Sequence, residues 1–123
     1  MAIFFSDNNG ITRSGSNGRR CTCITHGGLV YLSGITTVAL EGTMQEQTRD
    51  ILAQIDTHLA ANASDKTRVL MANITLHDMA GFGDFNAVWD EWVTDGQEPC
   101  RSVVQGELPL PEYRVQISLV AAQ

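Results

Sequence analysis

The spacing of apolar residues changes several times along the chain, and the first pattern is that of strands. "CTCITH" and "LVYLSGITT" are rich in apolar and β-branched residues, and the glycines between them, Gly27 and Gly28, are typical of a tight hairpin turn. A short strand, "AIFF", is expected to precede this pair. The first third of the chain is therefore predicted to be mostly strand.

Two later stretches have the three-and-four spacing of amphipathic helices. In the first, Thr43 is a candidate N-cap and Glu46 can return the bond in a capping box. An apolar stripe follows as far as Leu59, and the helix is expected to end at residues 61–63. The second follows Asp78, another candidate N-cap. Its apolar stripe consists of Phe82, Phe85, Trp89, Trp92 and Val93.

Three further apolar runs predict strands. "RVLMANITL" lies between the two helices, and "RSVVQGEL" and "YRVQISLVA" follow the second helix. The proline-bearing "PLPE" between the last two favours an antiparallel hairpin. The order β-β-β-α-β-α-β-β predicts an α+β fold, with a mixed β-sheet of about six strands and two helices packed on one face, in a single domain spanning residues 1–123.

The alternation of the last strand raises a question about the other face of this sheet. Val115 and Ile117 share one face, whereas Gln116 and Ser118 share the opposite one. Polar side chains are uncommon deep in the core of a monomer. We therefore expect this second face to meet another subunit, with plain exposure to solvent as the alternative.

Composition and charge narrow the range of partners. The chain has 123 residues, of which 43% are hydrophobic, and its formal net charge of −6 argues against nucleic acid as a partner. The one basic stretch, "RSGSNGRR", has no aromatic residue on which a base can stack, so we interpret it as a solvated loop. The beginning of the sequence lacks the features of a signal peptide and no run is long enough to span a membrane, which leads us to expect a cytoplasmic location.

The usual catalytic and metal-binding patterns are missing. His26, His58 and His77 are scattered and lack metal-ligand spacing with one another or with the three cysteines, so no metal or other cofactor is expected. The odd cysteine count favours reduced, mostly buried thiols. No nucleophile elbow or phosphate-binding glycine-rich loop is present.

Arg101 is the most distinctive candidate. It follows Pro99 and Cys100 at the head of an apolar run, where a guanidinium can grip a carboxylate with two parallel hydrogen bonds. From chemistry alone, a structural salt bridge is the competing interpretation.

The motifs "VYLSGIT", "FNAVWDEW", "PCRSVVQGELP" and "RVQISLVAA" resemble those of the RidA/YjgF family, which also carries the older label L-PSP endoribonuclease or translation inhibitor protein. The resemblance extends from about Leu29 onward. It implies a chorismate-mutase-like fold, a homotrimer, and small-molecule sites in the clefts between subunits. In the deaminase branch of this family, the arginine that matches Arg101 binds the carboxylate of a reactive enamine or imine, and water hydrolyses this substrate to a keto acid and ammonia.

The resemblance also assigns the surroundings of the site. Ser33 and Gly34 match a Ser-Gly pair in the pocket wall, and Asn86 matches a supporting asparagine on the second helix. Two further positions depart from the pattern: Gln116 replaces a glutamate that orients or activates water, and Val103 replaces a cysteine.

A third departure places Arg20 near the position of the family's pocket tyrosine. A second arginine at the pocket mouth would favour a dicarboxylate or another more anionic ligand, unless its side chain points into solvent.

Three functional hypotheses follow from the resemblance. The first is hydrolysis of a small carboxylate-bearing imine or enamine, with Arg101 and Gln116 as the catalytic residues. The second is a non-catalytic protein that binds a keto acid or a related metabolite, because the amide of Gln116 holds water but cannot take its proton. The third, RNA cleavage, rests on the older family label only.

Overall fold

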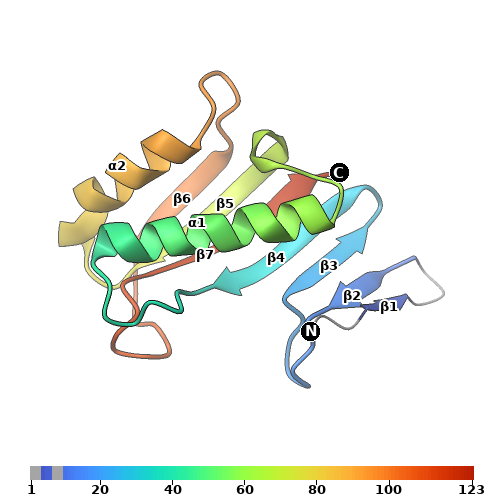
Figure 1. Ribbon diagram of the computed structural model, residues 1–123, viewed down its shortest axis with the longest axis horizontal. Coiled ribbons are helices and arrows are strands. Elements are labelled where there is room, and N and C mark those ends of the chain that lie inside the picture. The colour runs from blue at the N-terminus through green and yellow to red at the C-terminus, as the bar shows by residue number, and fades with distance from the viewer. Residues whose placement is uncertain (1–3, 7–9) are drawn as a thin grey trace.

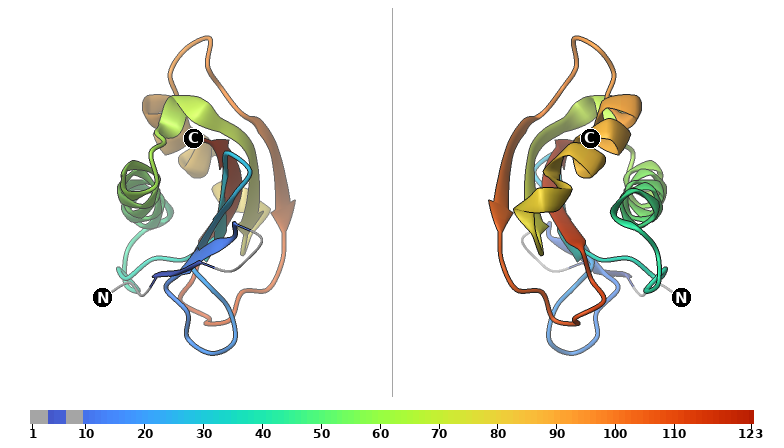
Figure 2. Two further views of the ribbon diagram at one scale, coloured as in Figure 1. Left: turned by 90° about the vertical axis from the view of Figure 1, so that its right-hand side faces the viewer. Right: turned by 90° about the vertical axis from the view of Figure 1, so that its left-hand side faces the viewer.

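The computed structural model describes residues 4–6 and 10–123, and it has one curved sheet with both helices on the same side (Figures 1 and 2). The strands are β1 (Phe4–Ser6), β2 (Thr12–Ser14), β3 (Cys23–His26), β4 (Leu29–Ile35), β5 (Val69–Leu76), β6 (Cys100–Gln105) and β7 (Val115–Ala122). The helices are α1 (Met44–Ala61) and α2 (Phe82–Trp92), with short 3-10 turns at Lys66–Arg68 and Met79–Gly81. The sheet order is β1-β2-β3-β4-β7-β5-β6. The expected α+β class, mixed sheet and one-sided helices are confirmed.

The amino-terminal part of the sheet holds one strand more than expected. β2 lies in the stretch interpreted as a solvated loop, and it pairs antiparallel with β1 and β3. Only the remainder of that stretch, residues 15–20, is a loop. Of the expected strand "AIFF", Ala2 and Ile3 lie outside the described residues, and β1 begins at Phe4.

Local signals in the sequence were sufficient for the first hairpin and the first helix. Gly27 and Gly28 have φ values of 58° and 80°, a left-handed conformation that glycine adopts without strain, and they connect β3 to β4. At the start of α1, the hydroxyl of Thr43 accepts from the backbone N–H of Glu46, whose carboxylate accepts from the N–H of Thr43. This is the expected capping box.

The last two strands do not form the hairpin that the sequence predicted. β7 pairs antiparallel with both β4 and β5, while β6 pairs with β5 in parallel at the edge of the sheet. The connection between them, residues 106–114, is tied at both ends to the end of β5: Gly106 N–H donates to the carbonyl of Leu76, and His77 N–H donates to that of Arg114. The proline-bearing segment therefore passes the carboxyl end of β5 to reach β7 and does not form a tight hairpin turn.

The core lies between the helices and the sheet. Val115, Ile117, Leu119 and Ala121 of β7 are buried on the helix-facing side, as the alternation predicted. On the other face Gln116 and Ser118 are partly exposed, and the apolar side chains of Tyr31 and Val104 are 40% and 56% exposed. This open face therefore combines polar and apolar side chains without a covering layer in the single chain.

Two smaller expectations concern thiols and membranes. Cys23 is buried, but Cys21 is half-buried and Cys100 is exposed, so the prediction of mostly buried thiols is wrong for the cysteine at the edge strand. All three are free. Within residues 4–6 and 10–123, no helix has the length and apolar character needed to cross a membrane.

Candidate functional site

Arg101 lies at the beginning of β6, and its guanidinium rests on side chains from α2. One Nη atom donates to Oδ1 of Asn86 over 2.8 Å, and the guanidinium carbon lies 5.8 Å and 5.5 Å from the ring centroids of Phe82 and Trp89. Rings at this distance attract a cation electrostatically and hold its plane. We call these four residues, Arg101, Asn86, Phe82 and Trp89, the arginine cluster.

The spacing of α2 and the register of β6 create this arrangement. Phe82, Asn86 and Trp89 are separated by four and three residues, so they share one helix face. Arg101 is aligned with Ala72 of β5, whose side chain is fully buried under the helices, so Arg101 points to the helix side of the sheet. Val103, two residues along β6, points to the same side and packs against the core.

Most of the hydrogen-bonding capacity of Arg101 is unused. A guanidinium has five N–H donors, and within the described part of the chain only the bond to Asn86 is formed. No carboxylate pairs with it there, so the structural salt bridge that the sequence left open is absent among these residues. A half-buried guanidinium with free parallel donors is suited to bind a carboxylate from outside the chain.

A second group of candidate residues surrounds an irregularity in β4. The register between β4 and β7 shifts between Leu32 and Ile35, which inserts one additional residue at Ser33–Gly34. A Cβ on Gly34 would lie 2.6 Å from both Cδ and Nε2 of Gln116, so the amide of Gln116 packs directly on the bare backbone. We call these three residues, Ser33, Gly34 and Gln116, the bulge cluster.

The bulge cluster has polar groups that are not all satisfied. The N–H of Ser33 donates to the carbonyl of Thr22 over 3.0 Å, but its Oγ is buried without a hydrogen-bond partner among the described residues. Gln116 is half-buried and lies opposite Thr75 of β5 on the open face. An amide there can hold a water molecule but cannot accept its proton.

The two clusters lie apart in one chain. Arg101 is aligned through Ala72 with Leu119, whereas Gln116 is three residues further along β7 and on the opposite face. Two strand spacings separate the clusters by roughly 10 Å across the sheet, and three residues separate them by roughly 10 Å along the strands. One small ligand cannot contact both clusters within a single subunit.

Arg20 belongs to an ordered turn near the bulge cluster. Its Nη1 donates to Oγ1 of Thr22 over 2.7 Å and to the carbonyl of Gly15 over 3.4 Å. The backbone N–H groups of Arg19 and Arg20 both donate to Oδ1 of Asn17, at 2.9 Å and 3.0 Å. Arg20 lines a hollow of about 290 Å³ together with Gly34.

Two members of the arginine cluster were not recognised as site residues from the sequence. Phe82 and Trp89 were placed in the apolar stripe of the second helix, which is correct, since Trp89 is 4% exposed. Their spacing relative to Asn86 was a usable signal, but the partner strand was needed to bring Arg101 above them. The expectation of no metal site is untested, although the described residues contain no group of three His, Cys, Asp or Glu that could hold an ion.

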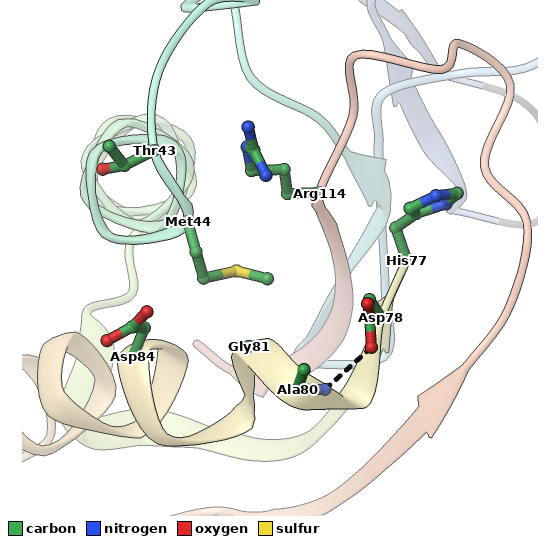
Figure 3. Close-up of a pocket in the computed structure, with 8 residues that line it drawn as sticks. All are labelled: Thr43, Met44, His77, Asp78, Ala80, Gly81, Asp84 and Arg114. Carbon is green, nitrogen blue, oxygen red and sulfur yellow. Dashed lines mark hydrogen bonds between the residues drawn. The ribbon is translucent and has the colours of Figure 1, made fainter.

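A different hollow, of about 380 Å³, opens between the start of α1, residues 77–84 and Arg114 (Figure 3). Arg114 and Asp84 lie on opposite sides of it and Met44 projects between them. Nε of Arg114 donates to the carbonyl of Gly42 over 3.1 Å. None of the site residues predicted from the sequence lines this hollow. The remaining lining residues are Thr43, His77, Asp78, Ala80 and Gly81.

Comparison with known proteins identifies relatives over nearly the full length. The family model described as Endoribonuclease L-PSP matches residues 14–123. The RutC family protein YoaB of Escherichia coli is 38% identical over 112 residues, which cover 91% of this chain and 97% of that protein. A RutC family protein of Haemophilus ducreyi is 33% identical, with 91% and 96% covered.

Solved structures agree with these matches. The crystal structure of NMB1025 from Neisseria meningitidis, a member of the YjgF protein family, is 41% identical and has a TM-score of 0.90, with 95% of this chain and 98% of that chain covered. An uncharacterized protein from Pseudomonas aeruginosa is 36% identical, also with a TM-score of 0.90, and 92% and 98% are covered.

Proposed function

The chain belongs to the endoribonuclease L-PSP family, which includes the YjgF and RutC family proteins, and we propose that it is an enamine/imine deaminase acting on a small carboxylate-bearing substrate. The observation that carries this proposal is the free guanidinium of Arg101. It is supported by Asn86 and two aromatic rings, and no carboxylate among the described residues pairs with it. A site of this kind recognises a carboxylate of a ligand.

The site is completed by a second copy of the chain. Since the arginine cluster and the bulge cluster face away from each other in one subunit, both act on one ligand only where two copies meet. The half-exposed apolar side chains on the open face, such as Val104, support an oligomer in which this face is covered. We propose a homotrimer with three equivalent clefts, as the family resemblance implies.

The proposed reaction is hydrolysis of a carbon–nitrogen double bond. An enamine substrate first tautomerises to the imine. Arg101 neutralises the carboxylate beside the imine carbon, which makes that carbon more electrophilic and fixes its position. Water adds to the carbon, the resulting carbinolamine loses ammonia, and the products are a keto acid and ammonia. Gln116 and the hydroxyl of Ser33 orient the water, which is the nucleophile.

The experiment is an assay with freshly generated 2-iminopropanoate. We expect acceleration of its hydrolysis by the protein and a loss on the order of 100-fold in kcat/KM for Arg101→Ala, corresponding to the removal of a charge-assisted carboxylate contact. Arg49→Ala is the matched control, because Arg49 is an exposed arginine on α1. No acceleration by the wild-type protein, or an unchanged rate in Arg101→Ala, would contradict the proposal.

Mixed oligomers test the shared cleft. Arg101→Ala and Gly34→Leu variants, each checked for folding by circular dichroism, are refolded together. With randomly mixed copies, about one quarter of the clefts combine an intact Arg101 with an intact bulge cluster. Activity that appears only in the mixture supports a cleft between subunits, and a mixture as inactive as its components contradicts it.

A second candidate function is favoured by one residue. Gln116 has no acidic or basic group, and a protein that binds a keto acid without hydrolysing an imine needs only the carboxylate contact of Arg101. Gln116→Glu distinguishes the two functions. In a binding protein, this change creates or raises imine hydrolysis. In a deaminase that works through a neutral amide, the wild type already hydrolyses the imine. We do not propose RNA cleavage, because the net charge of −6 disfavours a polyanion.

A further inference from the structure

The hollow beside Gly34 differs in character from the rest of this acidic protein. The chain has 14 Asp and Glu against 8 Lys and Arg, yet no carboxylate among the described residues lines this hollow of about 290 Å³. Its polar lining consists of Arg20, Thr22, Thr36, Thr37, Gln54, His58 and Tyr113. Gln54 is bonded to Asp50 and to the carbonyl of Thr36, and Oγ1 of Thr22 accepts from Arg20 and donates to the carbonyl of Gly15. The remaining donors of Arg20 and the side chains of His58 and Tyr113 are left to face a ligand.

Arg20 is positioned at this hollow by the turn that carries it. The bonds of Nη1 to Thr22 and to the carbonyl of Gly15 leave Nε and Nη2 without a partner within the part of the chain that is described. Gly15 is required for this geometry, since its φ is 68° and a Cβ there would lie 2.6 Å from Oγ1 of Thr22. The guanidinium is therefore fixed in advance, which reduces the entropy lost when it binds an anion.

Asp50 does not line the hollow, and one of its carboxylate oxygens is bonded to residues of the wall. Oδ2 of Asp50 accepts from the hydroxyl of Thr37, the N–H of Val38 and the amide of Gln54, at 2.8, 2.9 and 3.0 Å. These bonds commit the oxygen to the wall itself. His58, whose pKa is lowered by burial, adds no negative charge and offers a ring nitrogen to a ligand.

The hollow and the bulge cluster share one residue, Gly34. Gly34 lines the hollow, and the same glycine is in contact distance of the amide of Gln116. In the cleft proposed above, a ligand whose reacting carbon lies beside Gln116 would have to extend past Gly34 to reach Arg20. The two arginines would then hold the two ends of one molecule, Arg20 from one copy and Arg101 from the next.

We propose that Arg20 forms a subsite for a second acidic group, so that the substrates are 2-imino dicarboxylates or their enamine tautomers. This inference rests on the proposed function, because it extends the same cleft. The carboxylate next to the imine carbon binds Arg101, and the distal carboxylate binds Arg20. Water adds to the C=N bond, ammonia leaves, and the product is a 2-oxo dicarboxylate.

The test compares two imines and two adjacent arginines. The imines of 2-oxoglutarate and pyruvate, generated in place from glutamate and alanine with an amino acid oxidase, are offered to the wild type, Arg20→Ala and Arg19→Ala. We expect the wild type to have the higher kcat/KM for the dicarboxylic imine. Arg20→Ala should lower the ratio of the two kcat/KM values about 10- to 100-fold, the effect of one charge-assisted contact.

Arg19→Ala is the matched control because it removes the same charge from the same turn. The structure gives the side chain of Arg19 no contact with the hollow, and the backbone bond of Arg19 to Asn17 is kept. The ratio should therefore stay at the wild-type value. The subsite proposal is contradicted if the ratio of the two kcat/KM values is the same in Arg20→Ala as in the wild type. It is also contradicted if this ratio falls equally in Arg20→Ala and Arg19→Ala.

A binding measurement separates this inference from the proposed function. Isothermal titration with 2-oxoglutarate and with pyruvate needs no catalysis. If no imine is hydrolysed but 2-oxoglutarate binds more tightly than pyruvate and loses that advantage in Arg20→Ala, the subsite stands and the deaminase proposal fails. If imines are hydrolysed and the advantage is missing, the deaminase proposal stands and the subsite fails.

Discussion

The arginine cluster and the bulge cluster are held in place by different forces. Under Arg101, the rings of Phe85 and Trp89 stack with centroids 5.8 Å apart and are buried against the sheet. The segment that follows the bulge cluster is held by polar side chains on one face of α1. Gln54 donates to the carbonyl of Thr36, and Asp50 accepts from the next two residues.

Because of this contrast, the arginine cluster and the bulge cluster should respond differently to acid and to mutation. Apolar packing contains no group that titrates, so the arginine cluster should be insensitive to acid and sensitive to removal of its aromatic support. Hydrogen bonds to a carboxylate depend on its charge, so the bulge side should respond to acid. Three predictions test this division.

The largest effect is expected for Trp89→Ala. Trp89 is 4% exposed and supports Arg101 from below, so the change should lower the free energy of unfolding by about 3–5 kcal/mol and weaken keto acid binding in the molecules that remain folded. Urea unfolding and calorimetry measure the two quantities. Val88→Ala, in the same helix and 3% exposed, should lower stability but leave binding unchanged; equal binding by all three proteins would contradict the supporting role of Trp89.

An intermediate effect is expected for Gln47→Leu. This buried side chain accepts from the N–H of Arg114 and donates to the carbonyl of Glu112, both at 2.9 Å. Its loss leaves two backbone groups without partners and should cost about 1–3 kcal/mol. Amide exchange should become faster in residues 112–114, while the tryptophan fluorescence of α2 stays the same.

Gln45→Leu provides the control for this substitution. Gln45 lies in the same helix but is partly exposed, so the exchange of residues 112–114 should not change. Faster exchange in both variants would indicate a general loosening of α1, and it would contradict the specific role given to Gln47.

The smallest effect is expected for Asp50→Asn, and it depends on pH. Burial raises the pKa of Asp50, but the hydrogen bonds from Val38, Thr37 and Gln54 outweigh it, and the pKa lies below its ordinary value. A carboxyl whose pKa is depressed by folding stabilises the fold above its unfolded value, about 3.9, and this contribution is lost as the pH falls through the lower, folded value. The variant should therefore lose less stability than the wild type below about pH 4.

Urea midpoints across the acid range measure this difference. Asp84→Asn, which removes an exposed carboxyl from the first turn of α2, is the charge-matched control and should follow the wild-type profile. Parallel profiles for the wild type and Asp50→Asn would contradict the role given to Asp50.

The elements that the sequence predicted correctly are those whose signal is local. The bonds between Thr43 and Glu46 span three residues, and Gly27 and Gly28 form their turn by themselves. Partner choice is not local. The sequence placed β6 beside β7 because they are consecutive. In the structure β5 lies between them, and β7 is an interior strand in which alternate residues from Val115 to Ala121 are buried. Only the competition between β5 and β6 for the edge of β7 decides this pairing.

The same limit applies to the candidate site. The position of Arg101 at the head of a strand could be predicted, as could Asn86 on the second helix. The rings of Phe82 and Trp89 lie beside the guanidinium because of the way α2 packs over β6. The residue spacing within α2 or within β6 does not predict this packing. Arg20 was a candidate for a flexible loop, and the side chain of Asn17, which orders the turn, carries no recognisable motif.

The central place of β7 has a consequence for how the protein is made. Ribosomes add roughly 5–20 residues per second, and amino-terminal elements emerge first. Until residues 115–122 have left the exit tunnel, β4 and β5 lack the strand that lies between them. Unpaired strand edges are templates for pairing with other chains. The edges of β4 and β5 in the nascent polypeptide are therefore open to pairing with other chains until β7 emerges, and a premature stop before β7 removes a strand from the interior of the sheet.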